Sequence, residues 1–207
     1  MELLIIFVLF DILAAFLSFY NNGDLLGNIF TFILLGGLGA IIFTMRVHDF
    51  LIYRAISSKK YKKAIRMYKN KLKVTPNSKS RNGILLNLVP LYFMIDDIDN
   101  AREYLKKVDF LTLKKPILKS YYQLLQAYLK YKEGEFEKLD DYLESALNYE
   151  KEAKTTCDLL KLAVEIKKNP EKDLYGEFKK LPDDVEEYYF EPFDKLYLEL
   201  AEDLKMS

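Results

Sequence analysis

The stretch DDIDNAREYLKKVD, residues 96–109, decides the fold because its pattern occurs twice more in the chain. KKYKKAIRMYKNKL (59–72) and GEFEKLDDYLESAL (134–147) align with it without a gap. Three positions then hold an apolar or small residue in every copy: Tyr61, Ile98 and Phe136; Ala64, Ala101 and Leu139; Tyr68, Leu105 and Leu143. Spacings of three and four residues place these positions on one face of a helix. The pattern therefore predicts an amphipathic helix that recurs after 37 and then 38 residues.

A second helix is expected before each of the later copies, at LLNLVPLYFMI (85–95) and LLQAYLKYKEG (124–134). Paired helices of this kind resemble the tetratricopeptide (TPR) repeat, in which a small residue follows the entry of the second helix. The copies are three or four residues longer than the 34-residue TPR period, and the chain has no tryptophan. Pro90 is expected to kink its helix.

Further helices are predicted before and after these three copies. RVHDFLIYRAISS (46–58) is the predicted first helix of the first repeat, and residues 152–168 and 171–181 are the predicted helices of a fainter fourth unit. Residues 185–204, interrupted at Pro192, form the predicted C-terminal capping helix, acidic outside and aromatic inside. We therefore expect an all-α solenoid of about three to four TPR-like hairpins across residues 46–207.

The TPR resemblance also implies a binding surface, because that family binds peptides on the concave side of its stacked helices. Carried over position by position, this surface consists mainly of apolar and aromatic residues. The predicted partner-binding residues are Tyr53, Leu86, Pro90, Phe93, Lys119, Tyr122, Gln126 and Leu129. Ordinary packing of the same side chains is the alternative.

The first 45 residues have a different composition. Residues 3–20 include 13 Leu, Ile, Phe or Val, residues 25–45 form a second apolar run, and NNGD (21–24) is a turn signal between them. Each run approaches the ~20 residues that span a bilayer. Asp11 in the first run costs roughly 2.5–3.5 kcal/mol, against roughly 4–8 kcal/mol gained from the apolar residues. We therefore predict a transmembrane helical hairpin over residues 1–45.

Asp11 is an intramembrane polar residue, and such residues need a partner. A hairpin turning near Gly23 places Asp11 opposite Gly36, where small residues allow close packing. Asp11 would then hydrogen-bond Thr31, a backbone carbonyl or a second copy of the protein, and a transport role is the alternative. A cleaved signal peptide is a further alternative, although the run lacks a basic start and a small-residue cleavage site.

Charge predicts the orientation in the membrane. Residues 46–81 contain 12 Lys or Arg and one acid, Asp49, whereas the turn between the two apolar runs contains only Asp24. The positive-inside rule then places both termini in the cytoplasm, and this basic segment beside anionic lipid. The segment reads as an amphipathic helix rather than as a nucleic-acid site. A lysine-rich chain of this form fits a bacterial plasma membrane.

Little in the sequence suggests reaction chemistry. The chain has one histidine, His48, and one cysteine, Cys157, so a three-histidine or Cys/His metal site is excluded. Acid pairs such as Asp96–Asp97 and Asp140–Asp141 stand at expected helix starts, where they cap free amides. We predict no cofactor, no metal and no enzymatic activity. The predicted function is a membrane-anchored scaffold that recruits protein partners. The alternative is a hairpin that oligomerises or transports through Asp11, with the solenoid as its regulator.

Overall fold

The computed structural model of the chain describes residues 36, 37, 39, 46–182 and 191–206. Within these residues the chain is helical and contains no strand, so the all-α prediction is confirmed for them. None of the described helices is long and apolar enough to cross a bilayer. The predicted spans at 3–20 and 25–45, and Asp11 with them, lie outside the described residues.

The chain divides into two compact units, residues 1–59 and 60–207. In the first unit, residues 46–57 are helical, as expected for the start of the first repeat. Phe50 and Tyr53 on this helix are 61% and 69% exposed. The predicted pairing of 46–58 with 59–72 joins the two units and stays a prediction.

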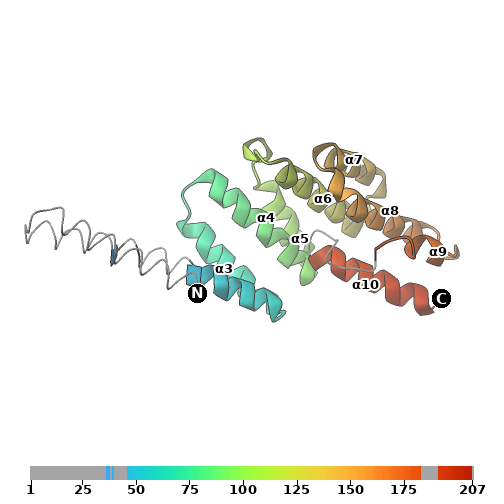
Figure 1. Cartoon of the computed structure of the whole chain (residues 1–207), viewed down its shortest axis with the longest axis horizontal. Coiled ribbons are helices and arrows are strands. Elements are labelled where there is room, and N and C mark those ends of the chain that lie inside the picture. Colours follow the sequence, from blue (N-terminus) through green and yellow to red (C-terminus); the bar gives the residue numbers. More distant parts are fainter. Residues whose placement is uncertain (1–35, 38, 40–45, 183–190, 207) are drawn as a thin grey trace, which may run out of the picture. The chain divides into compact units, whose positions relative to one another are not determined.

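The second unit is an array of helices joined by short connections (Figure 1). Its helices are α3 (Tyr61–Val74), α4 (Ser78–Met94), α5 (Ile98–Lys106), α6 (Pro116–Glu133), α7 (Leu139–Tyr149), α8 (Lys154–Lys168), α9 (Tyr175–Phe178) and α10 (Glu191–Met206). Three 3-10 turns lie between them: η1 (Phe110–Thr112), η2 (Phe136–Lys138) and η3 (Lys151–Ala153). Each helix from α3 to α8 packs against the next along the chain, which makes the array repeat-like.

The burial of the aligned positions explains why the three copies share them. Ala64 and Ala101 are fully buried, and Leu139 at the equivalent position is 2% exposed. Leu105 and Leu143 are also fully buried. The alanines at the second aligned position, Ala64 and Ala101, let neighbouring helices approach closely, and Leu105 and Leu143 at the third position fill the space beside them. The spacing therefore identified these five core residues correctly, whereas the other four aligned residues are only half-buried: Tyr61, Tyr68, Ile98 and Phe136.

Local signals set several helix ends. The Asp97 side chain accepts a hydrogen bond from the Asn100 amide at 3.2 Å and caps α5, as predicted for this acid pair. Gly134 ends α6 with φ +76°, a left-handed conformation that glycine adopts without a steric penalty. Pro90 is buried within α4, and the helix continues through it to Met94. The end of α4 was thus predicted to within one residue, despite this proline.

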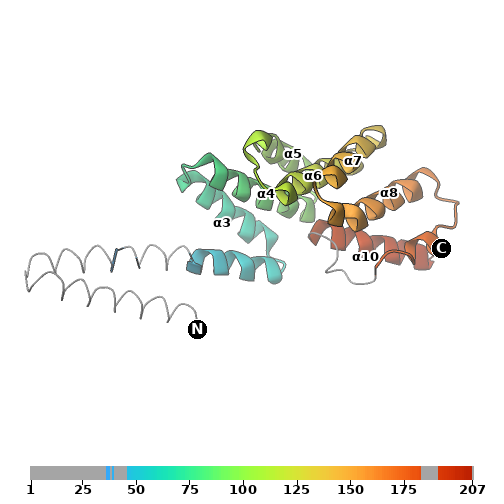
Figure 2. The same ribbon diagram turned by 45° about the horizontal axis from the view of Figure 1, so that its top comes forward.

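The predicted C-terminal helix is present as α10, although its place differs from that of an end cap. Helix α10 begins at Glu191 with Pro192 in its first turn, where proline is tolerated, and the predicted start of the helix at 185–190 lies outside the described residues. Helix α10 contacts both α8 and α4, so it reaches back along the array instead of covering only its last hairpin (Figure 2).

Candidate functional site: the face that holds helix α10

Three aromatic rings connect α10 to the array. The Phe93 ring of α4 meets the Tyr128 ring of α6 edge to face, with centroids 4.9 Å apart. The Tyr128 ring in turn meets Phe193 of α10 edge to face at 5.3 Å. All three side chains are at most 2% exposed. We call the surface of α4, α6 and α8 that α10 covers the inner face.

Helix α10 presents a continuous apolar stripe to its neighbours. Phe193, Leu196, Tyr197 and Leu200 are between 0% and 7% exposed, whereas Leu198 on the other side of the helix is 55% exposed. These positions follow the three-and-four spacing of an amphipathic helix. The Tyr197 ring also stacks on Phe178 of α9 at 4.9 Å. Helix α10 is therefore held as an amphipathic helix on a preformed apolar surface.

Charged groups form a rim around this apolar centre. Lys195 of α10 lies 3.6 Å from an Asp96 carboxylate oxygen, and Lys132 of α6 lies 3.3 Å from the other oxygen of the same carboxylate. Lys195 also pairs with Glu199 at 3.5 Å. Asp96 is 62% exposed, so these pairs contribute little stability and mainly set the register of the helix. An apolar centre with a polar rim is the anatomy of a protein–protein interface.

The electrostatics agree with the burial of this face. Burial raises the pKa of Tyr128 well above its usual value, and burial with the charge of Glu199 raises the pKa of Tyr131 to about 12. The Lys167 ammonium lies 4.0 Å from the centre of the Tyr131 ring. Desolvation, followed by the charge of Lys132, lowers the pKa of Lys167. The tyrosine hydroxyls are thus neutral at physiological pH, and the face offers apolar and cation–π contacts.

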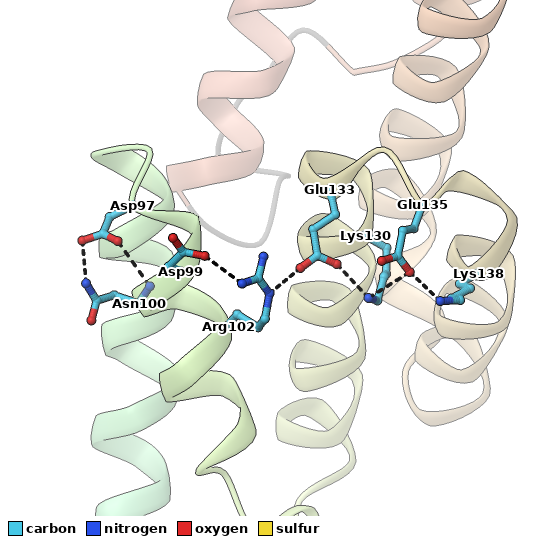
Figure 3. Close-up of polar contacts among 8 residues, drawn as sticks. All are labelled: Asp97, Asp99, Asn100, Arg102, Lys130, Glu133, Glu135 and Lys138. Atoms are coloured by element: carbon cyan, nitrogen blue, oxygen red, sulfur yellow. Dashed lines mark hydrogen bonds and ion pairs between the residues drawn. The ribbon is translucent and has the colours of Figure 1, made fainter.

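A hollow of about 780 Å³ lies between α5, α6 and the start of α7. An ion-pair relay crosses it, as Figure 3 shows. Arg102 donates from Nε to Glu133 at 2.6 Å and from a terminal nitrogen to Asp99 at 2.7 Å. Lys130 donates to Glu133 at 2.7 Å and to Glu135 at 3.2 Å. The relay joins α5 to the α6–α7 hairpin.

Asp99, Glu133 and Glu135 each have a basic partner in this relay, whereas Asp97 in the same figure is hydrogen-bonded to Asn100. Burial by itself would raise the pKa of Glu133, but hydrogen bonds from Lys130 and Arg102 outweigh burial and hold the pKa below its usual value. Hydrogen bonds from Lys138 and Lys130 likewise lower the pKa of Glu135. Because the opposite charges satisfy one another, the relay fixes one hairpin against the next instead of presenting an unpaired charge to a ligand.

The predicted partner-binding residues lie on more than one surface. Leu86, Pro90, Phe93 and Leu129 are buried, and Phe93 is the residue among them in the ring chain to α10. Leu129 and Gln126 line the hollow beside the ion-pair relay. Their proposed role in partner binding stays a prediction.

Lys119 and Tyr122 lie on the same helix, closer to η1, and the Gln126 amide donates to the Tyr122 hydroxyl at 2.7 Å. The Tyr122 ring is 5.2 Å from Phe110, and the Lys119 ammonium lies over the Phe110 and Tyr149 rings at 5.6 and 5.3 Å. Tyr53 belongs to the first unit. The predicted residues of the third repeat therefore follow one side of α6, from η1 to the hollow.

Two residues of the inner face were not in the predicted set, Tyr128 and Phe193. Helix α6 is buried around most of its circumference, including Tyr121, Leu125 and Tyr128. Periodicity therefore could not indicate which of its sides faces α10. The sequence did contain one signal for this contact. The aromatic side of the C-terminal helix required an apolar surface elsewhere in the chain to cover it.

Neither a thiol nucleophile nor a metal centre is available in the described part of the chain. Cys157 is fully buried, and burial raises the pKa of its thiol to about 12. Its sulfur points to the Leu143 carbonyl oxygen at 3.8 Å. The described residues contain no group of three or more His, Cys, Asp or Glu that could hold a metal ion. Comparison with protein-family models, curated proteins and solved structures gives no match.

Proposed function

We propose that the protein is a membrane-anchored, non-enzymatic scaffold whose helical array binds a partner protein as an amphipathic helix on the inner face. The observation that carries the proposal is that this face already holds a helix, α10, by a buried aromatic centre and a charged rim. Recognition of an amphipathic helix in an apolar groove is a common mode of protein interaction. A partner helix would take the place of α10, and α10 would leave when it binds.

The connection to α10 is compatible with such an exchange. Helix α9 contains only four residues, Tyr175–Phe178, and residues 183–190 separate it from α10. Detachment of α10 therefore breaks no hairpin between α3 and α8. The rim pairs that α10 makes through Lys195 are exposed and cost little to break. A partner helix would therefore compete with α10 mainly for the apolar contacts that Phe193 and its neighbours make.

A labelled peptide with the sequence of α10, residues 191–206, tests whether the inner face is a helix receptor. We expect the peptide to bind full-length Phe193→Ala protein, in which the chain's own helix is weakened, and not the unaltered protein. Addition of Tyr128→Ala should abolish this binding, because it removes the central ring of the face. Equal peptide binding to the single and double variants would contradict a specific site. Fluorescence anisotropy measures each case.

The membrane part of the proposal rests on composition, namely the two apolar runs and the 12-to-1 excess of basic residues over residues 46–81. We propose a membrane hairpin with both termini in the cytoplasm. Alkaline phosphatase, which is active only outside the cytoplasm, should stay inactive when fused after Ser207. A cytoplasmically active reporter at the same position should be active. The reverse pattern of reporter activity would rule out the proposed topology and would leave the proposal for the inner face unchanged.

A further inference from the structure

Three connections meet at one end of the array: α3–α4, α5–α6 and α7–α8. Successive helices in such arrays run in opposite directions, so alternate connections share an end. Contacts between the connections agree with this. Asn82 at the start of α4 donates to the Asp109 carbonyl in the α5–α6 connection at 2.9 Å, and the Phe110 and Tyr149 rings lie 6.0 Å apart. We call this end, residues 73–80, 107–119 and 149–154, the basic edge.

The basic edge concentrates exposed apolar side chains. Val74 is 80% exposed, Leu111 90%, Ile117 43% and Tyr149 37%. Elsewhere in the described part of the second unit, the large apolar side chains of comparable exposure are Tyr175 and Leu198. A single exposed leucine needs no explanation. Four such side chains on neighbouring connections indicate a surface that contacts something apolar.

The turn that carries Leu111 is rigidly held. Asn82 of α4 is only 4% exposed, and its amide group donates to the Asp109 carbonyl at 2.9 Å and to the Thr112 hydroxyl. Its carbonyl oxygen accepts from the Asp109 amide at 3.1 Å. The Asp109 carboxylate in turn accepts from the Leu111 amide at 3.2 Å. These bonds fix η1 with the Leu111 side chain projecting into solvent.

The charge of this end is positive. The connections 73–80, 107–115 and 149–154 contain seven lysines and three acids, whereas the connections 95–97, 134–138 and 169–174 at the opposite end contain two lysines and six acids. Lys114 and Lys115 flank the Leu111 turn and have no ion-pair partner within the described residues. Positive charge around projecting apolar side chains complements the headgroups and hydrocarbon of an anionic bilayer.

We propose that the basic edge docks on an anionic lipid surface, with Leu111 inserted below the headgroups and Lys114 and Lys115 among them. Tyr149 and Tyr122 have the amphipathic rings that favour this interfacial layer. A polyanion such as RNA would pair with the lysines but leave Leu111 and Val74 in water. The proposal does not require any particular partner on the inner face, so it can fail or succeed independently of that site.

Tryptophan fluorescence tests the docking directly, because the chain contains no tryptophan. Full-length protein with Leu111→Trp is compared with Leu198→Trp, which places the probe at an exposed apolar position of α10. The vesicles are phosphatidylcholine alone or with about 30% phosphatidylglycerol, an anionic lipid, and carry brominated acyl chains as quenchers. We expect a blue shift and quenching for the probe at position 111 in the anionic vesicles, and neither effect for the probe at 198.

Charge reversal then separates docking from other causes. Lys114→Glu with Lys115→Glu, added to Leu111→Trp, should lower the ratio of docked to undocked protein by about tenfold or more. The matched control reverses Lys179 and Lys180, an exposed pair away from this edge, and should leave the quenching unchanged. Unaltered far-UV circular dichroism shows that each variant is folded.

Three results would overturn the proposal. One is identical emission from position 111 in neutral and anionic vesicles. Another is insensitivity of the quenching to the reversal of Lys114 and Lys115. The third is an equal blue shift with soluble polyglutamate and no lipid, which would assign the edge to an acidic protein instead.

Discussion

Phe193→Ala should detach α10 from the inner face while the rest of the array stays folded. The Phe193 side chain is fully buried, and truncation of a buried phenylalanine costs about 3–5 kcal/mol. Part of this cost is its edge-to-face contact with Tyr128, since such ring pairs contribute about 0.5–1.5 kcal/mol beyond their buried area. Since 1.4 kcal/mol is a factor of ten, the equilibrium for local detachment should shift by about 100- to 4000-fold.

Hydrogen–deuterium exchange of the full-length protein measures this shift. Amides of residues 191–206 should exchange about 100-fold faster or more in the variant, whereas amides in the centres of α4 and α6 should keep their protection. Leu198→Ala is the matched control on the same helix, because that side chain is 55% exposed and its truncation should change stability by at most about 0.5 kcal/mol. Equal loss of protection throughout the second unit would refute the reasoning, because α10 would then be part of one cooperative core.

Three further results are expected. Asn82→Ala should lower the free energy of unfolding by about 1–3 kcal/mol, because it removes three hydrogen bonds and takes away the acceptor of the Asp109 amide, while the Asp109 carbonyl keeps its bonds from Thr112. Chemical denaturation followed by circular dichroism would show this loss, and a shift within error would contradict the fixed turn. Glu133→Gln should destabilise the protein at pH 7, and because folding lowers the pKa of Glu133, the stability from its charge is present above the pKa of the unfolded state and lost as pH falls through the pKa of the folded state. The melting temperatures of variant and original protein should therefore converge in acid. A difference in melting temperature that does not change with pH would exclude a stabilising ion pair with Arg102. Cys157 should resist iodoacetamide at pH 8 until the protein is unfolded, as intact-mass measurements would reveal, and prompt labelling of native protein would disprove its burial.

The sequence predicted the helices of the array better than their exposed or covered faces. Three-and-four spacing identified Ala101 and Leu143 as core residues, and both are fully buried. Acids at the expected helix starts were also interpreted correctly, as Asp97 shows. Both predictions depend on interactions within one helical hairpin, and residues a few positions apart in sequence encode such interactions directly.

The candidate site depended on contacts between distant segments, which local patterns do not encode. Tyr128 and Phe193 are 65 positions apart in sequence, and nothing near either residue specifies the other. The turn that presents Leu111 is similar, since it is held by Asn82 from the preceding hairpin. The positions carried over from the TPR resemblance follow one side of α6, where Gln126 lines the hollow beside the ion-pair relay, and they do not include Tyr128, whose ring contacts α10.

The geometry of a helix layer makes the two proposed surfaces compatible. The basic edge consists of helix ends and the connections between them, whereas the inner face consists of the sides of α4, α6 and α8. A lipid surface against the helix ends would therefore leave the sides of the helices accessible. The opposite end, with six acids and two lysines in its connections, would be repelled by anionic headgroups. The zero net charge of the chain conceals this difference between the two ends. On an anionic membrane the difference would give the array a defined orientation, in which the inner face would stay free for the proposed exchange of α10 for a partner helix.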